Sequence, residues 1–201
     1  MKGKLIELES FQIIDSLVDL SKYSSEEAEV VRRIIHATGD VEYAELVRFS
    51  HNAIDLVKDA IKKRWSVVCD VEMVKAGITE RLAAEFGLEL KSFINDKRVL
   101  ELARKKGLTR AETSIEFANG LYDGIIFVIG NAPTALLKVI DLYKQNQLKN
   151  SVVIAFPVGF VKAAFSKEQL LKTNIPYITN VGQKGGSAVA AAAFRAVAKL
   201  L

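Results

Sequence analysis

The chain has 201 residues, of which 50% are hydrophobic and 26% are charged, and its formal net charge is +4. This is an ordinary globular composition, and the length fits one domain that needs no disulfide or structural metal. The single Cys69 excludes an internal disulfide and suits a reducing compartment. No apolar run approaches the roughly 20 residues that span a bilayer, and residues 1–9 hold no signal-peptide core. We therefore expect a soluble, cytoplasmic protein with no membrane partner.

The basic residues do not form a nucleic-acid-binding pattern. Lys and Arg are interspersed with Glu and Asp, without a dense cluster and without interleaved aromatic residues. The sequence therefore predicts no nucleic-acid partner. Solvated surface charge accounts for the net charge, and a small anionic ligand is the alternative explanation.

Residues 1–64 are predicted to be helical. Apolar residues recur at helical spacing between 11 and 18, and Ser24 with Glu27 forms a capping box before a second amphipathic segment. Gly39 supplies a C-terminal stop for that helix. Two further amphipathic stretches follow, Tyr43–Phe49 and Ala53–Ile61.

Residues 65–201 are predicted to alternate between strands and helices. The predicted strands are Val67–Cys69, Leu90–Ile94, Gly124–Ile129, Ser151–Phe156 and Tyr177–Val181. The helices between them have start signals at Asp96, at Thr109 with Glu112, and at Ser166 with Gln169. The last predicted helix is the Ala-rich segment Ser187–Leu201. Such alternation predicts a mainly parallel sheet covered on both faces. We expect one α/β domain over 1–201, with a helical N-terminal region before an alternating β/α core.

Three loops rich in Gly follow predicted strands, at 130–134, 157–160 and 182–187. In open parallel sheets, ligands bind beyond the carboxyl ends of the strands. Glycines let the backbone approach a ligand, and N–H groups at the following helix starts attract carboxylate or phosphate. Turn formation explains any one loop, but three at one sheet edge favour a ligand site. The candidate binding residues in these loops are Asn131, Thr134, Gly159, Lys184, Gly186 and Ser187.

The reactive side chains exclude several classes of enzyme. Two His residues and one Cys match no zinc spacing. The chain has no Walker loop, no full G-x-G-x-x-G after a strand and no G-x-S-x-G elbow. If the chain is an enzyme, we expect it to work with ordinary side chains and no evident cofactor or metal.

His36 is the best candidate for an acid/base, because it ends the predicted helix that follows Ser24. The partial negative charge of a helix C-terminus favours an exposed imidazolium by roughly 0.3–1 kcal/mol, which suits a proton donor. A histidine that only caps the helix is the alternative, and spacing alone favours it. His51 is expected to lie on the surface.

Two further positions have open interpretations. Asp70 and Glu72 follow a predicted strand and could be paired carboxylates, although turn and cap roles are favoured. Arg110 begins a capped helix, where a cation opposes the helix dipole. A bound anion or a simple surface position explains Arg110 equally well.

Several strings of the sequence together resemble the precorrin-8X methylmutases. They are Arg33–Asp40, Asp70–Val74, Gly130–Leu136, Pro157–Val161 and Gly185–Ala188. None is specific alone, but they occur in order, and the resemblance runs from Glu9 to the last helix. It implies a flavodoxin-like three-layer α/β sandwich, a homodimer and a corrinoid substrate.

The resemblance also implies an activity, the shift of a methyl group from C-11 to C-12 of precorrin-8 or its cobalt form, giving hydrogenobyrinate or cobyrinate. By position, His36 matches the proton donor/acceptor, Ser10 and Arg33 match substrate-binding residues, and Arg110 matches the Arg of a Thr-Arg loop. A 1,5-sigmatropic shift needs no redox step, metal or nucleophile. The alternatives are a non-catalytic corrinoid carrier and a nucleotide-binding α/β protein.

The sequence departs from the family pattern at a few positions. Glu9 stands where the family usually has Arg, and Gln183 stands in a closing loop that often begins Gly-Arg. Lys162 and Phe165 replace a pattern of small residues and Glu. These changes put individual carboxylate contacts in question, with Lys184 as a possible substitute. The sequence leaves open whether the substrate already holds cobalt.

Overall fold

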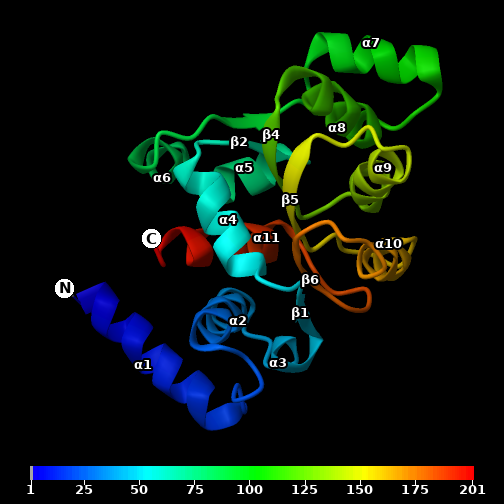
Figure 1. Ribbon diagram of the computed structural model, residues 1–201. Coiled ribbons are helices and arrows are strands. Elements are labelled where there is room, and N and C mark those ends of the chain that lie inside the picture. The colour runs from blue at the N-terminus through cyan, green and yellow to red at the C-terminus, as the bar shows by residue number, and fades with distance from the viewer. Residues whose placement is uncertain (1) are drawn as a thin grey trace.

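A six-stranded sheet runs through the centre of the computed structural model, which describes residues 2–201 (Figure 1). Its strands are β1 (Val47–Phe49), β2 (Ser66–Cys69), β3 (Leu90–Ser92), β4 (Gly124–Ile129), β5 (Asn150–Ala155) and β6 (Tyr177–Asn180). Their spatial order is β1-β6-β5-β4-β2-β3. All neighbouring pairs are parallel except β1 with β6. The five parallel strands therefore have the chain order 2-1-3-4-5, which is flavodoxin-like, and the predicted fold class is confirmed.

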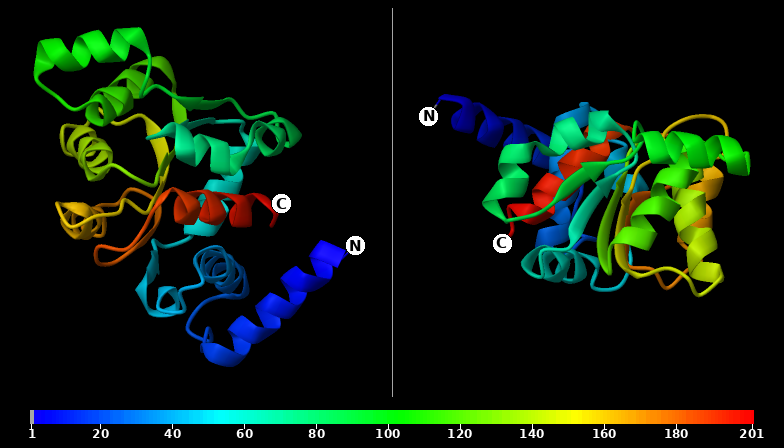
Figure 2. Two further views of the ribbon diagram at one scale, coloured as in Figure 1. Left: turned by 180° about the vertical axis from the view of Figure 1, so that it is seen from behind. Right: turned by 90° about the horizontal axis from the view of Figure 1, so that it is seen from above.

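Helices cover both faces of the sheet (Figure 2). One face carries α2 (Ser25–Thr38), α4 (Ala53–Lys62), α5 (Glu72–Ile78) and α11 (Ser187–Ala198). The other carries α7 (Lys97–Lys106), α8 (Arg110–Leu121), α9 (Pro133–Lys144) and α10 (Ala163–Leu170). The short helices are α3 (Tyr43–Leu46) and α6 (Glu80–Glu85), and α1 (Lys2–Leu17) packs on α2. No helix within residues 2–201 has both the length and the apolarity needed to cross a membrane.

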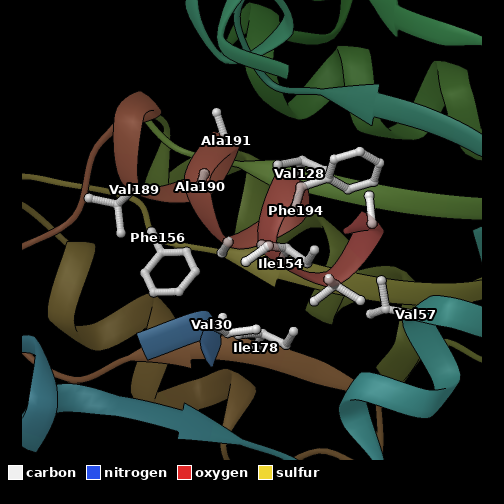
Figure 3. Close-up of a cluster of buried hydrophobic side chains, with 14 of the residues drawn as sticks. Val30, Val57, Val128, Ile154, Phe156, Ile178, Val189, Ala190, Ala191 and Phe194 are labelled. Carbon is white, nitrogen blue, oxygen red and sulfur yellow. The ribbon is translucent and has the colours of Figure 1, made fainter. Parts of the chain in front are cut away.

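Helix α11 is the centre of the larger hydrophobic core. Phe194 and Ala190 on α11 pack among buried residues that include Val128 of β4, Ile154 of β5 and Phe156, which follows β5 directly (Figure 3). Alanine side chains allow α11 to approach the sheet closely. A Cβ on Gly130 would lie 2.7 Å from Ser187 Cα, which leaves room only for glycine there. The helix is therefore held rigidly against the carboxyl edge of the sheet.

Most predicted helix signals are confirmed, and one is wrong. The capping boxes at Ser24 and Thr109 form with Glu27 and Glu112, and Gly39 ends α2 with a φ of +65°. Ser166, in contrast, lies buried inside α10, where its Oγ donates to the carbonyl of Ala163. The N-cap is Lys162, four residues before the N-cap that the S-x-x-Q spacing suggested, because the chain turns at Lys162 with a φ of +64°.

The helical prediction is also wrong at residues 47–49. Helix α3 has only four residues, and Val47–Phe49 then form β1, with Val47 opposite Asn180 of β6. This tripeptide is β-branched or aromatic at both ends, which suits a strand. It pairs because β6 would otherwise leave an open sheet edge. Such pairing is a tertiary effect that local periodicity does not encode.

Candidate active site

A cleft of about 360 Å³ opens between α1, α2, α5 and α11. Its charged and polar side chains are Glu7, Arg33, His36, Arg195 and Lys199. Its remaining lining consists of small residues, Ala37, Gly77, Ala188, Ala191 and Ala192. The cleft therefore combines a smooth apolar surface with a rim that carries three cations and one carboxylate.

His36 lies in the last turn of α2 and is exposed to the cleft. Ser10 on α1 places its Oγ 2.8 Å from His36 Nδ1. The ring of Phe11 meets the imidazole edge-on, with centroids 5.4 Å apart and planes at 85°. Because Nδ1 is engaged by Ser10, Nε2 is the nitrogen left to exchange a proton with a ligand. Helix α1 thus orients the imidazole that the sequence singled out.

Arg33 lies one turn before His36 and joins α1 to α2. Its Nη1 is 2.7 Å from Glu7 Oε1, and its Nε is 2.7 Å from Glu29 Oε1. The guanidinium also lies over the face of Phe11, 5.0 Å from the ring centroid. The hydrogen bond from Arg33 lowers the pKa of Glu7. The structure therefore brings Ser10 of α1 to Arg33 and His36 of α2, which lie more than 20 residues further along the chain.

Asp70 holds the loop after β4. This carboxylate is fully buried and accepts backbone N–H groups from Gly130 at 3.0 Å, Asn131 at 2.8 Å and Ala132 at 2.7 Å. Burial raises the pKa of Asp70, and the three N–H groups oppose that rise. The N–H groups of Gly130, Asn131 and Ala132 are therefore not free for a bound anion, because the chain's own carboxylate occupies them, which corrects the expectation for this part of the loop. Glu72 instead begins α5.

Arg33 is the predicted binding residue that lines the cleft, and Arg110, Thr134 and Asn131 are among those that do not. Arg110 is exposed at the start of α8, on the opposite face of the sheet from α2 and α11. Thr134 accepts a hydrogen bond from Thr109 Oγ1 at 3.1 Å, and Asn131 is exposed. Their assignment to substrate binding stays a prediction.

The two remaining Gly-rich loops pack against each other. Gly159 N–H donates to the Gln183 carbonyl at 3.1 Å, and Gly186 N–H donates to the Phe156 carbonyl at 2.8 Å. A Cβ on Gly185 would lie 2.2 Å from the Phe156 carbonyl oxygen, so only glycine fits there. The closing loop leads through Ser187 into Ala188, which lines the cleft.

Lys184 does not present a free ammonium to the cleft. Its Nζ is 2.6 Å from Asp40 Oδ2 and 2.8 Å from Glu42 Oε2, and hydrogen bonds to these carboxylates raise the pKa of Lys184. The ion pair ties the closing loop to the chain just after α2. Lys184 therefore holds the loop with an ammonium that two carboxylates already share, and its expected contact with substrate carboxylates stays a prediction.

The family model described as precorrin-8X methylmutase matches residues 5–200, essentially the whole chain. The chain belongs to the precorrin-8X methylmutase family. Family membership makes it a methylmutase, an isomerase of cobalamin biosynthesis.

Individual relatives agree with the family match. A cobalt-precorrin-8 methylmutase of Leptospira interrogans is 43% identical, over 97% of this chain and 92% of its own length. A precorrin-8X methylmutase of Sinorhizobium is 36% identical, over 98% of this chain and 94% of its own length. A solved structure of the methylmutase from Thermus thermophilus gives a TM-score of 0.89 at 38% identity, covering 98% of this chain and 96% of that one.

Sequence reasoning missed three charged residues of the methylmutase cleft, Glu7, Arg195 and Lys199. A signal for two of them was present. Arg195 and Lys199 follow Ala188 by seven and eleven residues, which places all three on one helix face. Glu7 had no such signal, because the packing direction of α1 is not encoded locally.

The other reactive groups lie elsewhere. Cys69 is fully buried at the end of β2, and burial raises the pKa of its thiol well above the ordinary value. Within residues 2–201, no three His, Cys, Asp or Glu side chains gather in a way that could hold a metal ion. The groups that the cleft itself offers are an imidazole, guanidinium and ammonium cations, and a carboxylate.

Lys167 on α10 is a buried cation beneath the closing loop. Its Nζ donates to the Lys184 carbonyl at 2.6 Å and to Asn180 Oδ1 at 3.1 Å. No carboxylate lies within 4 Å of it among the described residues. Burial lowers the pKa of Lys167 from 10.5 to about 8.

This lysine gives a prediction for the pH dependence of stability. Between pH 8 and pH 10.5 the unfolded chain binds more protons at Lys167 than the folded chain, so its contribution to the free energy of unfolding rises with pH. The slope is at most about 1.4 kcal/mol per pH unit. We expect urea unfolding at several pH values to show this rise in the wild type and its loss in Lys167→Met. Identical pH dependence in the two proteins would contradict the prediction.

Proposed function

We propose that the chain catalyses the 1,5-sigmatropic shift of a methyl group from C-11 to C-12 of precorrin-8 or cobalt-precorrin-8. The product is hydrogenobyrinate or cobyrinate. The observation that carries the proposal is the Ser10–His36 hydrogen bond in a cleft that also holds Arg33. The methyl group migrates with its bonding electron pair, so no oxidant or reductant is consumed and the substrate and product are isomers.

His36 acts as the proton donor and acceptor of this shift. A protonated imidazole donates from Nε2 to the conjugated macrocycle, which draws electron density away from the migrating system. The same nitrogen takes the proton back once the methyl group has moved. Ser10 accepts the Nδ1–H and keeps the ring pointed into the cleft. General acid/base help of this kind contributes about 10²–10⁴ in rate.

The cleft suits a corrinoid because both parts of that ligand find a matching surface. The apolar macrocycle lies against Ala188, Ala191 and Ala192, and its acetate and propionate groups reach the cationic rim. Gly186 and Ser187 immediately precede Ala188 of the cleft, and the backbone N–H groups that begin α11 at Ser187 favour carboxylate. Gly159 supports the closing loop through its hydrogen bond to Gln183.

Mixing the purified protein with substrate tests the proposal. We expect conversion of precorrin-8 or cobalt-precorrin-8 to the orange product, followed by absorbance, with the two substrates assayed side by side. The relatives that match this chain include both cobalt-precorrin-8 and precorrin-8X methylmutases. The substrate that is converted faster therefore shows whether the enzyme acts before or after cobalt is inserted. Tight binding without conversion of either substrate would instead identify a corrinoid carrier.

We also propose that the protein acts as a homodimer. Helix α1 projects from the body of the molecule (Figures 1 and 2). It exposes large apolar side chains, each at least half accessible, at Leu5, Ile6, Leu8, Ile13 and Leu17. A second copy packed on α1 would cover these side chains and stabilise the element that holds Ser10.

Light scattering tests this assembly. We expect the wild type to have twice the 22.1 kDa mass of one chain, and Ile13→Asp to shift it towards a single chain, because a buried carboxylate in an apolar interface is costly. Gln147→Asp, an exposed position after α9 that adds the same charge away from α1, is the matched control. A single-chain mass for the wild type at micromolar concentration would contradict the proposal.

A further inference from the structure

One face of α11 forms a stripe that changes from apolar to cationic along its length. Ala188, Ala191 and Ala192 come first, and Arg195 and Lys199 follow at helical spacing. A helix rises about 1.5 Å per residue, so the two cations lie about 10 and 16 Å along the axis from Ala188. The cleft therefore has an apolar stretch that leads to a positively charged end.

His36 lies at the other end of the cleft. Lys184, just before α11, pairs with Asp40, just after α2, so the end of α2 meets the start of α11. Along α1, Ser10 contacts His36, whereas Glu7, one turn earlier, contacts Arg33 and lies 3.9 Å from Lys199. The imidazole and the two α11 cations are thus at opposite ends of one surface.

Arg195 is the cation of the cleft that lacks a carboxylate. Within residues 2–201 it has no acidic partner within 4 Å, whereas Arg33 pairs with Glu7 and Glu29. Its Nη1 donates only to the Gly77 carbonyl, at 3.2 Å. A Cβ on Gly77 would lie 2.7 Å from Ala191 Cβ, so this glycine lets α5 approach α11 closely enough for that contact. The guanidinium is therefore steadied by one bond and keeps its other donors for a ligand.

We propose that Arg195 and Lys199 bind peripheral carboxylates of the substrate at the end of the cleft away from His36, and so set where the macrocycle meets the imidazole. Arg can hold a carboxylate through two parallel N–H bonds, which fixes orientation as well as position. Lys199 adds a second, more mobile charge one turn away. The site then binds a macrocycle with free carboxylates more tightly than the same macrocycle whose carboxylates are converted to amides or esters.

The identity of the polycarboxylate as a corrinoid rests on the proposed function. The binding of hydrogenobyrinate and the binding of its neutral methyl ester, each measured by absorbance titration, are compared to test the role of the two cations. For Arg195→Gln and Lys199→Gln we expect about tenfold weaker binding of the acid and unchanged binding of the ester. Arg195→Lys, which keeps the charge but loses the planar fork, should weaken acid binding by less. Arg104→Gln, an exposed arginine on α7 at the other face, is the matched control.

Two results would overturn the inference. One is acid binding by Arg195→Gln and Lys199→Gln that equals the wild type. The other is an equal loss for acid and ester, which would indicate a structural role. Failure of the proposed function gives a different result. A wild type that binds the acid through Arg195 but does not isomerise precorrin-8 or its cobalt form would refute the activity and support this inference.

Discussion

Replacing Asp70 with alanine is expected to lower the free energy of unfolding by about 3–5 kcal/mol. The substitution leaves three backbone N–H groups, those of Gly130, Asn131 and Ala132, without an acceptor at the carboxyl edge of the sheet. Each buried, unsatisfied donor costs about 1–3 kcal/mol. The loop cannot relax freely, because Gly130 is packed against Ser187 of α11.

Urea unfolding followed by circular dichroism measures this loss. Asp123→Ala is the matched control, because its side chain is 96% exposed and its removal should change stability by no more than about 0.5 kcal/mol. Asp70→Asn should lie between the two, since an amide oxygen keeps part of the acceptor capacity. An Asp70→Ala protein as stable as the control would show that the carboxylate does not hold the loop.

Replacing His36 with alanine is expected to lower kcat by about 10²–10⁴, with substrate affinity changed much less. The imidazole is the proton carrier of the proposed shift, whereas the apolar surface and cationic rim that hold the substrate remain in the variant. Folding should be preserved, because the side chain is exposed and α2 keeps its caps at Ser24 and Gly39.

Two further variants sharpen this prediction. His36→Gln can still hydrogen-bond to Ser10 but cannot carry a proton, so it should be as inactive as His36→Ala. His51→Ala, which removes the other histidine from an exposed position, should turn over like the wild type. Single-turnover rates at saturating substrate separate chemistry from binding. Normal turnover by His36→Ala would remove the proton-transfer role.

Much of the fold could be predicted because its strands are buried on both faces. The strand Gly124–Ile129 is a continuous apolar run that is almost completely buried, and its neighbours in the sheet give the same signal. Strand β1 could not be predicted in this way. Three residues carry too little periodicity, and Val47 is drawn into the sheet by the open edge of β6. Ser166 shows the converse failure, a local capping pattern that the packing of α10 overrides.

In the candidate site, too, local features could be predicted from the sequence and contacts between distant residues could not. The helix end made His36 a candidate, and the resemblance to the family pointed to His36 together with Ser10 and Arg33. Long-range partners could not be read from local pattern. Asp70 meets a loop 60 residues further along the chain, and Lys184 meets Asp40 across 144 residues. Both are charges whose role depends on what the fold brings to them.

The most direct test of the proposed activity follows the migrating carbon itself. Substrate labelled with carbon-13 in the C-11 methyl group is incubated with the wild type, and the product is examined by NMR. The proposed shift predicts that the labelled methyl group appears at C-12, and that a mixture of labelled and unlabelled substrate gives no exchange of label between molecules. Label that stays at C-11 in bound corrinoid, or that scrambles between molecules, would contradict the proposed intramolecular shift.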